Sequence, residues 1–95
     1  MHLLKIDVEG HEQKVLRGLA SRLRADRPLI VMELVGSPDC KGGFRGEGDL
    51  RAYLYPEHEL MSLRGKHRRC RLTRFDWACE TAVIIPSEMR GHFGV

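Results

Sequence analysis

The chain has 95 residues and a mass of 10.9 kDa, which excludes two independent hydrophobic cores and any complete large enzyme fold. Its hydrophobic fraction of 42% and its charged fraction of 31% are ordinary for a folded domain, and they argue against a disordered tail or a low-complexity linker. The formal net charge is +3, and most of the positive excess lies in residues 64–95.

Three cysteines, Cys40, Cys70 and Cys79, form no C-x-x-C pair, so the sequence indicates neither a disulfide framework nor a zinc ribbon. We therefore expect a reducing, cytoplasmic location. The longest apolar runs, residues 29–32 and 82–85, are far shorter than the ~18 residues of a membrane span, and no charged-then-apolar leader opens the chain. The sequence thus predicts a soluble protein without membrane contact.

A strand, a helix and a second strand are predicted at the start of the chain. Residues 2–8 are aliphatic up to the turn at Gly10 and predict a mostly buried strand. Residues 11–25 predict an amphipathic helix that Pro28 stops, and residues 29–34 form a continuous apolar segment typical of a parallel sheet. This order predicts a right-handed βαβ unit.

The remainder of the chain predicts shorter elements. Five glycines and a proline make residues 36–48 a predicted long, mobile loop of the kind that acts as a lid or substrate loop. Asp49 is predicted to cap a short helix, and residues 59–63 and 81–85 are predicted strands. Between these strands, residues 64–74 hold six Lys or Arg and predict a hairpin or a loop between antiparallel strands.

Acidic residues follow the first predicted strand, at the end where parallel sheets bind ligands. A carboxylate from Asp7 or Glu9 could orient an acceptor hydroxyl or take its proton, and the imidazole of His11 could serve as a base near neutral pH. The structural alternative is that Asp7 bonds turn amides and Glu9 favours the helix start. Glu33 is a further candidate, because a carboxylate in an apolar strand needs a partner, and we expect it to face the same crevice as Asp7.

Metal binding is a weaker alternative for these residues. The candidate acids and His11 are suitable ligand types, but nothing in their spacing sets a geometry. His67, Cys70 and Cys79 lack the paired spacing of a zinc site. The sequence therefore predicts no metal site.

The basic segment, residues 64–74, supports a rival function. With Phe75 and Trp77 close behind, it is compatible with a small non-catalytic module that binds nucleic acid or phosphate. Such a module would bind polyanions with an affinity that falls steeply with salt. No recognised nucleic-acid motif is present, so nucleic acid is the less favoured partner.

The string L-K-I-D-V-E-G-H-E at residues 4–12, followed by V-L-R-G at 15–18 and P-L-I-V-M-E-L at 28–34, closely resembles the FkbM family of S-adenosylmethionine-dependent methyltransferases. Residues 53–63 and 80–86 resemble the closing strands of this family more loosely. The resemblance implies an α/β class I methyltransferase with a Rossmann-like sheet in the order 3-2-1-4-5-7-6, whose last strand is antiparallel.

On this plan, residues 3–8 resemble strand four, 29–34 strand five, 59–63 strand six and 81–85 strand seven. The chain, residues 1–95, is therefore similar to the C-terminal part of such a domain, with strands 4-5-7-6. The first strand begins almost at residue 1, and we expect that an N-terminal, cofactor-binding half precedes it in the complete domain. Another chain or segment would then cover the outer edge of the Leu3–Val8 strand.

The resemblance also implies a reaction. The complete enzyme would move a methyl group from S-adenosylmethionine to a hydroxyl of a sugar or small metabolite, with Asp7, Glu9 and His11 bordering the acceptor site. The glycine-rich turn and the acidic residue that hold the cofactor in this class have no counterpart here. We therefore expect this chain to be inactive by itself.

Overall fold

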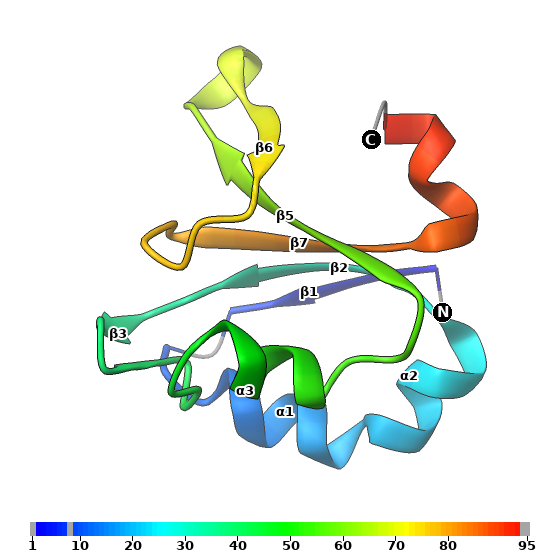
Figure 1. The fold of residues 1–95 in the computed structure, drawn as a ribbon, viewed down its shortest axis with the longest axis horizontal. Coiled ribbons are helices and arrows are strands. Elements are labelled where there is room, and N and C mark those ends of the chain that lie inside the picture. Colours follow the sequence, from blue (N-terminus) through cyan, green and yellow to red (C-terminus); the bar gives the residue numbers. More distant parts are fainter. Residues whose placement is uncertain (1, 8, 94–95) are drawn as a thin grey trace.

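The computed structural model describes residues 2–7 and 9–93 and shows a five-stranded sheet with its three helices gathered on one side (Figure 1). Within these residues, no helix is long and apolar enough to cross a membrane. In chain order, the elements are β1 (Leu3–Ile6), α1 (Glu12–Gly18), α2 (Ala20–Asp26), β2 (Leu29–Glu33), β3 (Gly36–Ser37), β4 (Cys40–Lys41), α3 (Glu47–Ala52), β5 (His58–Arg64), β6 (Arg71–Arg74) and β7 (Thr81–Pro86), with 3₁₀ turns at His67–Arg69 and Ser87–Phe93.

The main sheet has the strand order β1-β2-β7-β5-β6, and it is mostly antiparallel. Among the paired strands of the described residues, β1 and β2 alone are parallel neighbours, and α1 and α2 join them as the predicted βαβ unit requires. The strand β7 lies between β2 and β5 and is antiparallel to both. The basic segment forms the predicted antiparallel hairpin, and its second strand, β6, extends the sheet beyond β5.

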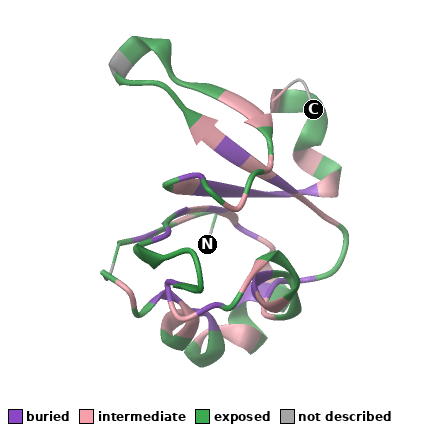
Figure 2. Ribbon diagram, turned by 60° about the vertical axis from the view of Figure 1, so that its left-hand side comes forward, coloured by how far each residue is buried: buried purple, intermediate pink, exposed green. Residues whose placement is uncertain are grey.

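The hydrophobic core lies between the sheet and the helices. Ile30, Ile84 and Leu60 are neighbours across three adjacent strands, and all three side chains are buried in this layer. On the opposite face of β7, Val83 and Ile85 are also buried, which explains the continuous apolar run of that strand. Figure 2 shows this burial along the central strands, whereas residues 64–66 and 68–71 of the β5–β6 hairpin are exposed.

The predicted single helix over residues 11–25 is divided into α1 and α2 at Leu19. The Leu19 N–H donates to both the Val15 and Leu16 carbonyls, at 3.1 and 3.3 Å, which tightens the turn after Gly18. Glycine weakens the helix at this point because its backbone is more flexible than that of other residues. The apolar face predicted for the helix still packs on the sheet.

The prediction of a long loop over residues 36–48 is wrong, because two tight turns fold this segment. The strands β3 and β4 form a small hairpin, and Lys41 and Phe44 then exchange backbone hydrogen bonds of 2.9 Å around Gly42 and Gly43. Both glycines have positive φ, as a type I′ turn requires. Phe44 is fully buried, so an apolar anchor holds the segment on the core.

Two local predictions also need correction. Asp49 is not the cap of α3: Gly46 precedes the helix, and the Asp49 carboxylate accepts the Arg45 N–H at 3.0 Å from within the first turn. The first strand is less buried than predicted, because β1 is an edge strand; Leu3 is 60% exposed and Lys5 is also exposed.

An arginine joins three separate segments at the amino end of β2. Arg27 follows α2 in the left-handed conformation and donates to both carboxylate oxygens of Glu88, at 2.8 and 2.7 Å. It also donates to the Pro56 and Glu57 carbonyls, at 2.6 and 2.8 Å, and lies over the Tyr55 ring. We call Arg27, Glu88 and Tyr55 the arginine clamp.

Because of the arginine clamp, the free energy of unfolding should depend on pH. The hydrogen bonds from Arg27 lower the pKa of Glu88 from 4.5 to about 2. Because the folded pKa is the lower one, this stabilisation is complete above pH 4.5 and is lost as pH falls toward 2. Urea unfolding from neutral to acid pH should therefore show wild type and Glu88→Gln converging in stability. Glu47→Gln, which removes an exposed ion pair with Arg51, is the control. A difference in stability between wild type and Glu88→Gln that does not change with pH would contradict the prediction.

Candidate functional site

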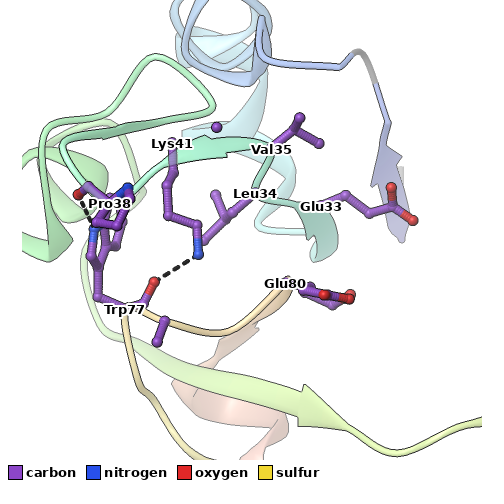
Figure 3. Close-up of a pocket in the computed structure, with 10 residues that line it drawn as sticks. Glu33, Leu34, Val35, Pro38, Lys41, Trp77 and Glu80 are labelled. Carbon is purple, nitrogen blue, oxygen red and sulfur yellow. Dashed lines mark hydrogen bonds between the residues drawn. The ribbon is translucent and has the colours of Figure 1, made fainter.

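A pocket of about 580 Å³ lies where β2 ends and β7 begins (Figure 3). Its walls come from the end of β2, the β3–β4 hairpin and the segment before β7. The volume is in the range of pockets that hold small molecules. The charged and aromatic residues of its lining are Glu33, Lys41, Trp77 and Glu80.

Hydrogen bonds tie the two sides of this pocket together. The Lys41 ammonium group donates to the Trp77 and Cys79 carbonyls, at 2.8 and 2.5 Å. The indole N–H of Trp77 donates back to the Pro38 carbonyl at 3.0 Å. Lys41 is only 7% exposed and lies 5.7 Å from the centre of the indole ring. The β3–β4 hairpin is thus fastened to the segment before β7.

Two carboxylates occupy the other side of the pocket. Figure 3 shows Glu33 and Glu80 pointing away from Lys41, Pro38 and Trp77. Both are exposed, and neither forms an ion pair among the described residues. The backbone holds them close, because the Leu34 N–H donates to the Glu80 carbonyl at 2.7 Å. Two carboxylates are therefore available to a ligand at this end.

Of the acidic and histidine residues proposed for catalysis from the sequence, only Glu33 lines the pocket. It escapes the expected cost of burial because it lies at the exposed end of β2. Asp7, Glu9 and His11 are exposed and are not part of the lining. Glu9 and Gly10 both have positive φ, so they form the turn into α1. A catalytic role for Asp7, Glu9 and His11 stays a prediction.

Asp7 nevertheless lies near the same end of the sheet as Glu33. In the parallel pair, Ile6 lies opposite Met32. Asp7 and Glu33 are the next residues along the two strands, although Val8 is outside the described residues. Glu33 lines the pocket and Asp7 does not, so a crevice shared by the two stays a prediction.

Sequence reasoning missed Lys41, Trp77 and Glu80 as pocket residues. Lys41 precedes a Gly-Gly turn, and its sequence context gives no sign that its ammonium group is buried. The sequence suggests Trp77 only as a base-stacking residue. The one sequence signal for a binding role is that Trp77 is the single tryptophan of the chain, because tryptophan is common in binding sites.

The basic segment contributes to a second pocket of about 360 Å³, which includes Arg64 and Lys66. Arg64 pairs with Asp76 at 2.9 Å. Phe75 and Trp77, the aromatic residues that base stacking would need, pack against the core instead. The structure therefore gives no support to the nucleic-acid module.

The described residues form neither a metal-binding cluster nor a disulfide. No three His, Cys, Asp or Glu residues there gather into a group that could hold a metal ion. The cysteines are free: Cys40 and Cys70 are exposed, and Cys79 is buried.

Glu12, at the start of α1, is a buried acid without a partner. Its side chain is fully buried, and neither carboxylate oxygen has a hydrogen bond among the described residues. It packs against the turn after β4: a Cβ added to Gly42 would lie 3.2 Å from Glu12 Oε2. The adjacent Gln13 N–H donates to the Gly42 carbonyl at 2.8 Å.

Replacing Glu12 with methionine is expected to raise the free energy of unfolding by about 1 kcal/mol, because an apolar side chain of similar length needs no hydrogen bond there. Urea unfolding of the purified variant measures the change. Glu47→Met, at an exposed position of α3, is the control and should leave stability nearly unchanged. A destabilised Glu12→Met would show that the carboxylate is satisfied in solution.

The chain matches the Methyltransferase FkbM domain over residues 1–69. This match includes both strands of the βαβ unit, the β3–β4 hairpin and the pocket residues Glu33 and Lys41. No curated protein matches the chain, and no solved structure matches it. Because the match covers more than half of the chain, the protein belongs to the FkbM methyltransferase domain family.

Proposed function

We propose that this domain takes part in methyl transfer from S-adenosylmethionine to a hydroxyl group of a sugar or small metabolite, and that the pocket beside Glu33 holds the acceptor. The observation that carries the proposal is the position of the pocket at the carboxyl end of β2. Open α/β sheets bind ligands at this end of their parallel strands. The carboxylates of Glu33 and Glu80 point to one side of it (Figure 3).

The strand neighbours support placing the chain, residues 1–95, in the C-terminal part of a Rossmann-like methyltransferase sheet. The order β1-β2-β7-β5, with β7 antiparallel, corresponds to strands 4-5-7-6. The sheet has β1 at its edge, with Leu3 60% exposed. Exposed apolar edges are normally covered, so we propose that another segment or chain pairs with β1.

The described residues do not by themselves fit S-adenosylmethionine. The turn between β1 and α1 has one glycine, Gly10, and it is preceded by the exposed acids Asp7 and Glu9. A glycine-rich cradle of backbone N–H groups is what would hold the methionine part. No cofactor contact is therefore assigned to this chain, and we propose that the segment covering β1 supplies those contacts.

The part of the reaction left to this chain is handling of the acceptor. A hydroxyl oxygen that takes up a methyl group must lose its proton, and a nearby carboxylate can orient the hydroxyl and accept that proton. Glu33 is placed for this role by the end of β2, with Glu80 beside it. Asp7, Glu9 and His11 follow β1 outside the lining of this pocket, so they would border only a part of the acceptor that extends beyond it.

Binding and transfer experiments test this function separately. Calorimetric titration of the folded chain with S-adenosylhomocysteine should show no tight binding, whereas adding the segment that covers β1 should restore it. Tight binding by this chain alone would contradict the partial cofactor site.

Transfer of a radiolabelled methyl group to a panel of sugars then tests the reaction in the protein that binds cofactor. Glu33→Gln should lower the rate at least about tenfold, and Glu47→Gln, on α3, should not. Transfer to no hydroxyl compound, or a full rate for Glu33→Gln, would overturn the proposal.

A further inference from the structure

Lys41 has one hydrogen-bond donor more than its protein partners use. An ammonium group carries three N–H donors. Two of them go to the Trp77 and Cys79 carbonyls. Lys41 also lines the pocket, so its third donor is available to a ligand there.

The positive charge of Lys41 has no counter-charge in the described part of the chain. Its hydrogen-bond partners are both neutral carbonyls, and no ion pair includes it. With only 7% of the residue exposed, water screens this charge weakly. A buried cation is normally paired, so the missing partner is expected to come with the ligand.

The arrangement of charges in the pocket predicts how that ligand is oriented. Lys41 and Trp77 lie on one side, and Glu33 and Glu80 point away from them on the other (Figure 3). An anionic group would be attracted at the Lys41 side and repelled at the carboxylate side. A hydroxyl group, in contrast, can donate to either carboxylate.

We propose that the acceptor carries an anionic oxygen group, bound by the third N–H of Lys41, and presents its hydroxyl at Glu33 and Glu80. The simplest ligand of this kind is a sugar acid; a sugar phosphate shares the same chemistry. Calling the ligand an acceptor rests on the proposed function, but the choice of an anionic ligand rests on Lys41 alone.

Trp77 provides a direct measurement, because it is the single tryptophan and lies in the pocket wall. Its fluorescence is followed while the folded chain is titrated with methyl glucuronoside, glucose 6-phosphate or methyl glucoside at low ionic strength. An anionic probe should bind about tenfold more tightly than the neutral glucoside. The preferred anion distinguishes a carboxylate from a phosphate ligand.

Variants at Lys41 locate the effect. Lys41→Gln keeps a donor for one carbonyl but removes the charge, and the preference should fall to about twofold or less. Lys41→Arg should retain most of it. Lys66→Gln, in the second pocket, is the matched control and should leave it unchanged. Circular dichroism confirms that each variant is folded.

Three results would overturn the inference: equal binding of charged and neutral probes, an unchanged preference in folded Lys41→Gln, or loss of the preference in Lys66→Gln. If Lys41→Gln does not fold, the inference is tested in two other ways. The preference for anionic probes should be unchanged in Lys66→Gln, and in the wild type it should weaken as the salt concentration rises. The fluorescence titration measures binding and involves no methyl transfer. A failed transfer assay together with a retained anion preference would therefore refute the proposed reaction and leave the ligand class intact.

Discussion

Replacing Arg27 with alanine is expected to lower the free energy of unfolding by about 3 kcal/mol. The substitution removes two hydrogen bonds to Glu88 and leaves the carbonyls of Pro56 and Glu57 without their donor. It also removes the guanidinium group from the Tyr55 ring, 4.8 Å away. Three segments distant in sequence lose their common contact, so the effect should exceed that of any single surface pair.

Urea unfolding measures this loss, with Arg22→Ala as the control. Arg22 forms an ion pair with Asp26 within α2, but its side chain is 69% exposed, so its loss should change stability by no more than about 0.5 kcal/mol. Arg27→Lys should recover little, because an ammonium group cannot reproduce the fork of donors. Equal effects of Arg27→Ala and Arg22→Ala would contradict a special role for the arginine clamp.

The second large effect is expected at Phe44. Phe44→Ala should lower the free energy of unfolding by about 3 to 4 kcal/mol, because it leaves a cavity where a fully buried ring was. The Phe44 ring packs edge-on against Tyr53, with centroids 5.7 Å apart. Its backbone also closes the turn with Lys41, so the pocket wall should loosen along with the core.

Thermal unfolding and Trp77 fluorescence together check this second prediction. Val35→Ala, next to the same hairpin but 43% exposed, is the control and should change stability by less than about 1 kcal/mol. Phe44→Ala should also alter the emission of Trp77, which is fastened to the hairpin through Lys41 and Pro38. A stable Phe44→Ala with unchanged emission would show that the hairpin does not depend on its aromatic anchor.

Local sequence signals were sufficient for the elements with clear apolar periodicity. The strands β2, β5 and β7 and the helical region before Pro28 lie where they were predicted, because continuous apolar runs and breaking residues act over a few neighbouring positions. The same signals misjudged Leu3, since the sequence does not show that β1 lies at an edge. They also misjudged residues 36–48. The glycine-rich composition indicates a loop, but the buried Phe44 holds this segment against the core.

By itself, the sequence determined the family, the βαβ start and the acidic end of the first parallel strand, because these depend on residues close together in the chain. The tertiary structure alone decided which residues form the pocket. Glu33, Lys41 and Trp77 come from three segments, and only the antiparallel insertion of β7 beside β2 brings them together. Burial of Lys41 against two carbonyls is likewise a property of packing, since neither carbonyl is a sequence neighbour of the lysine.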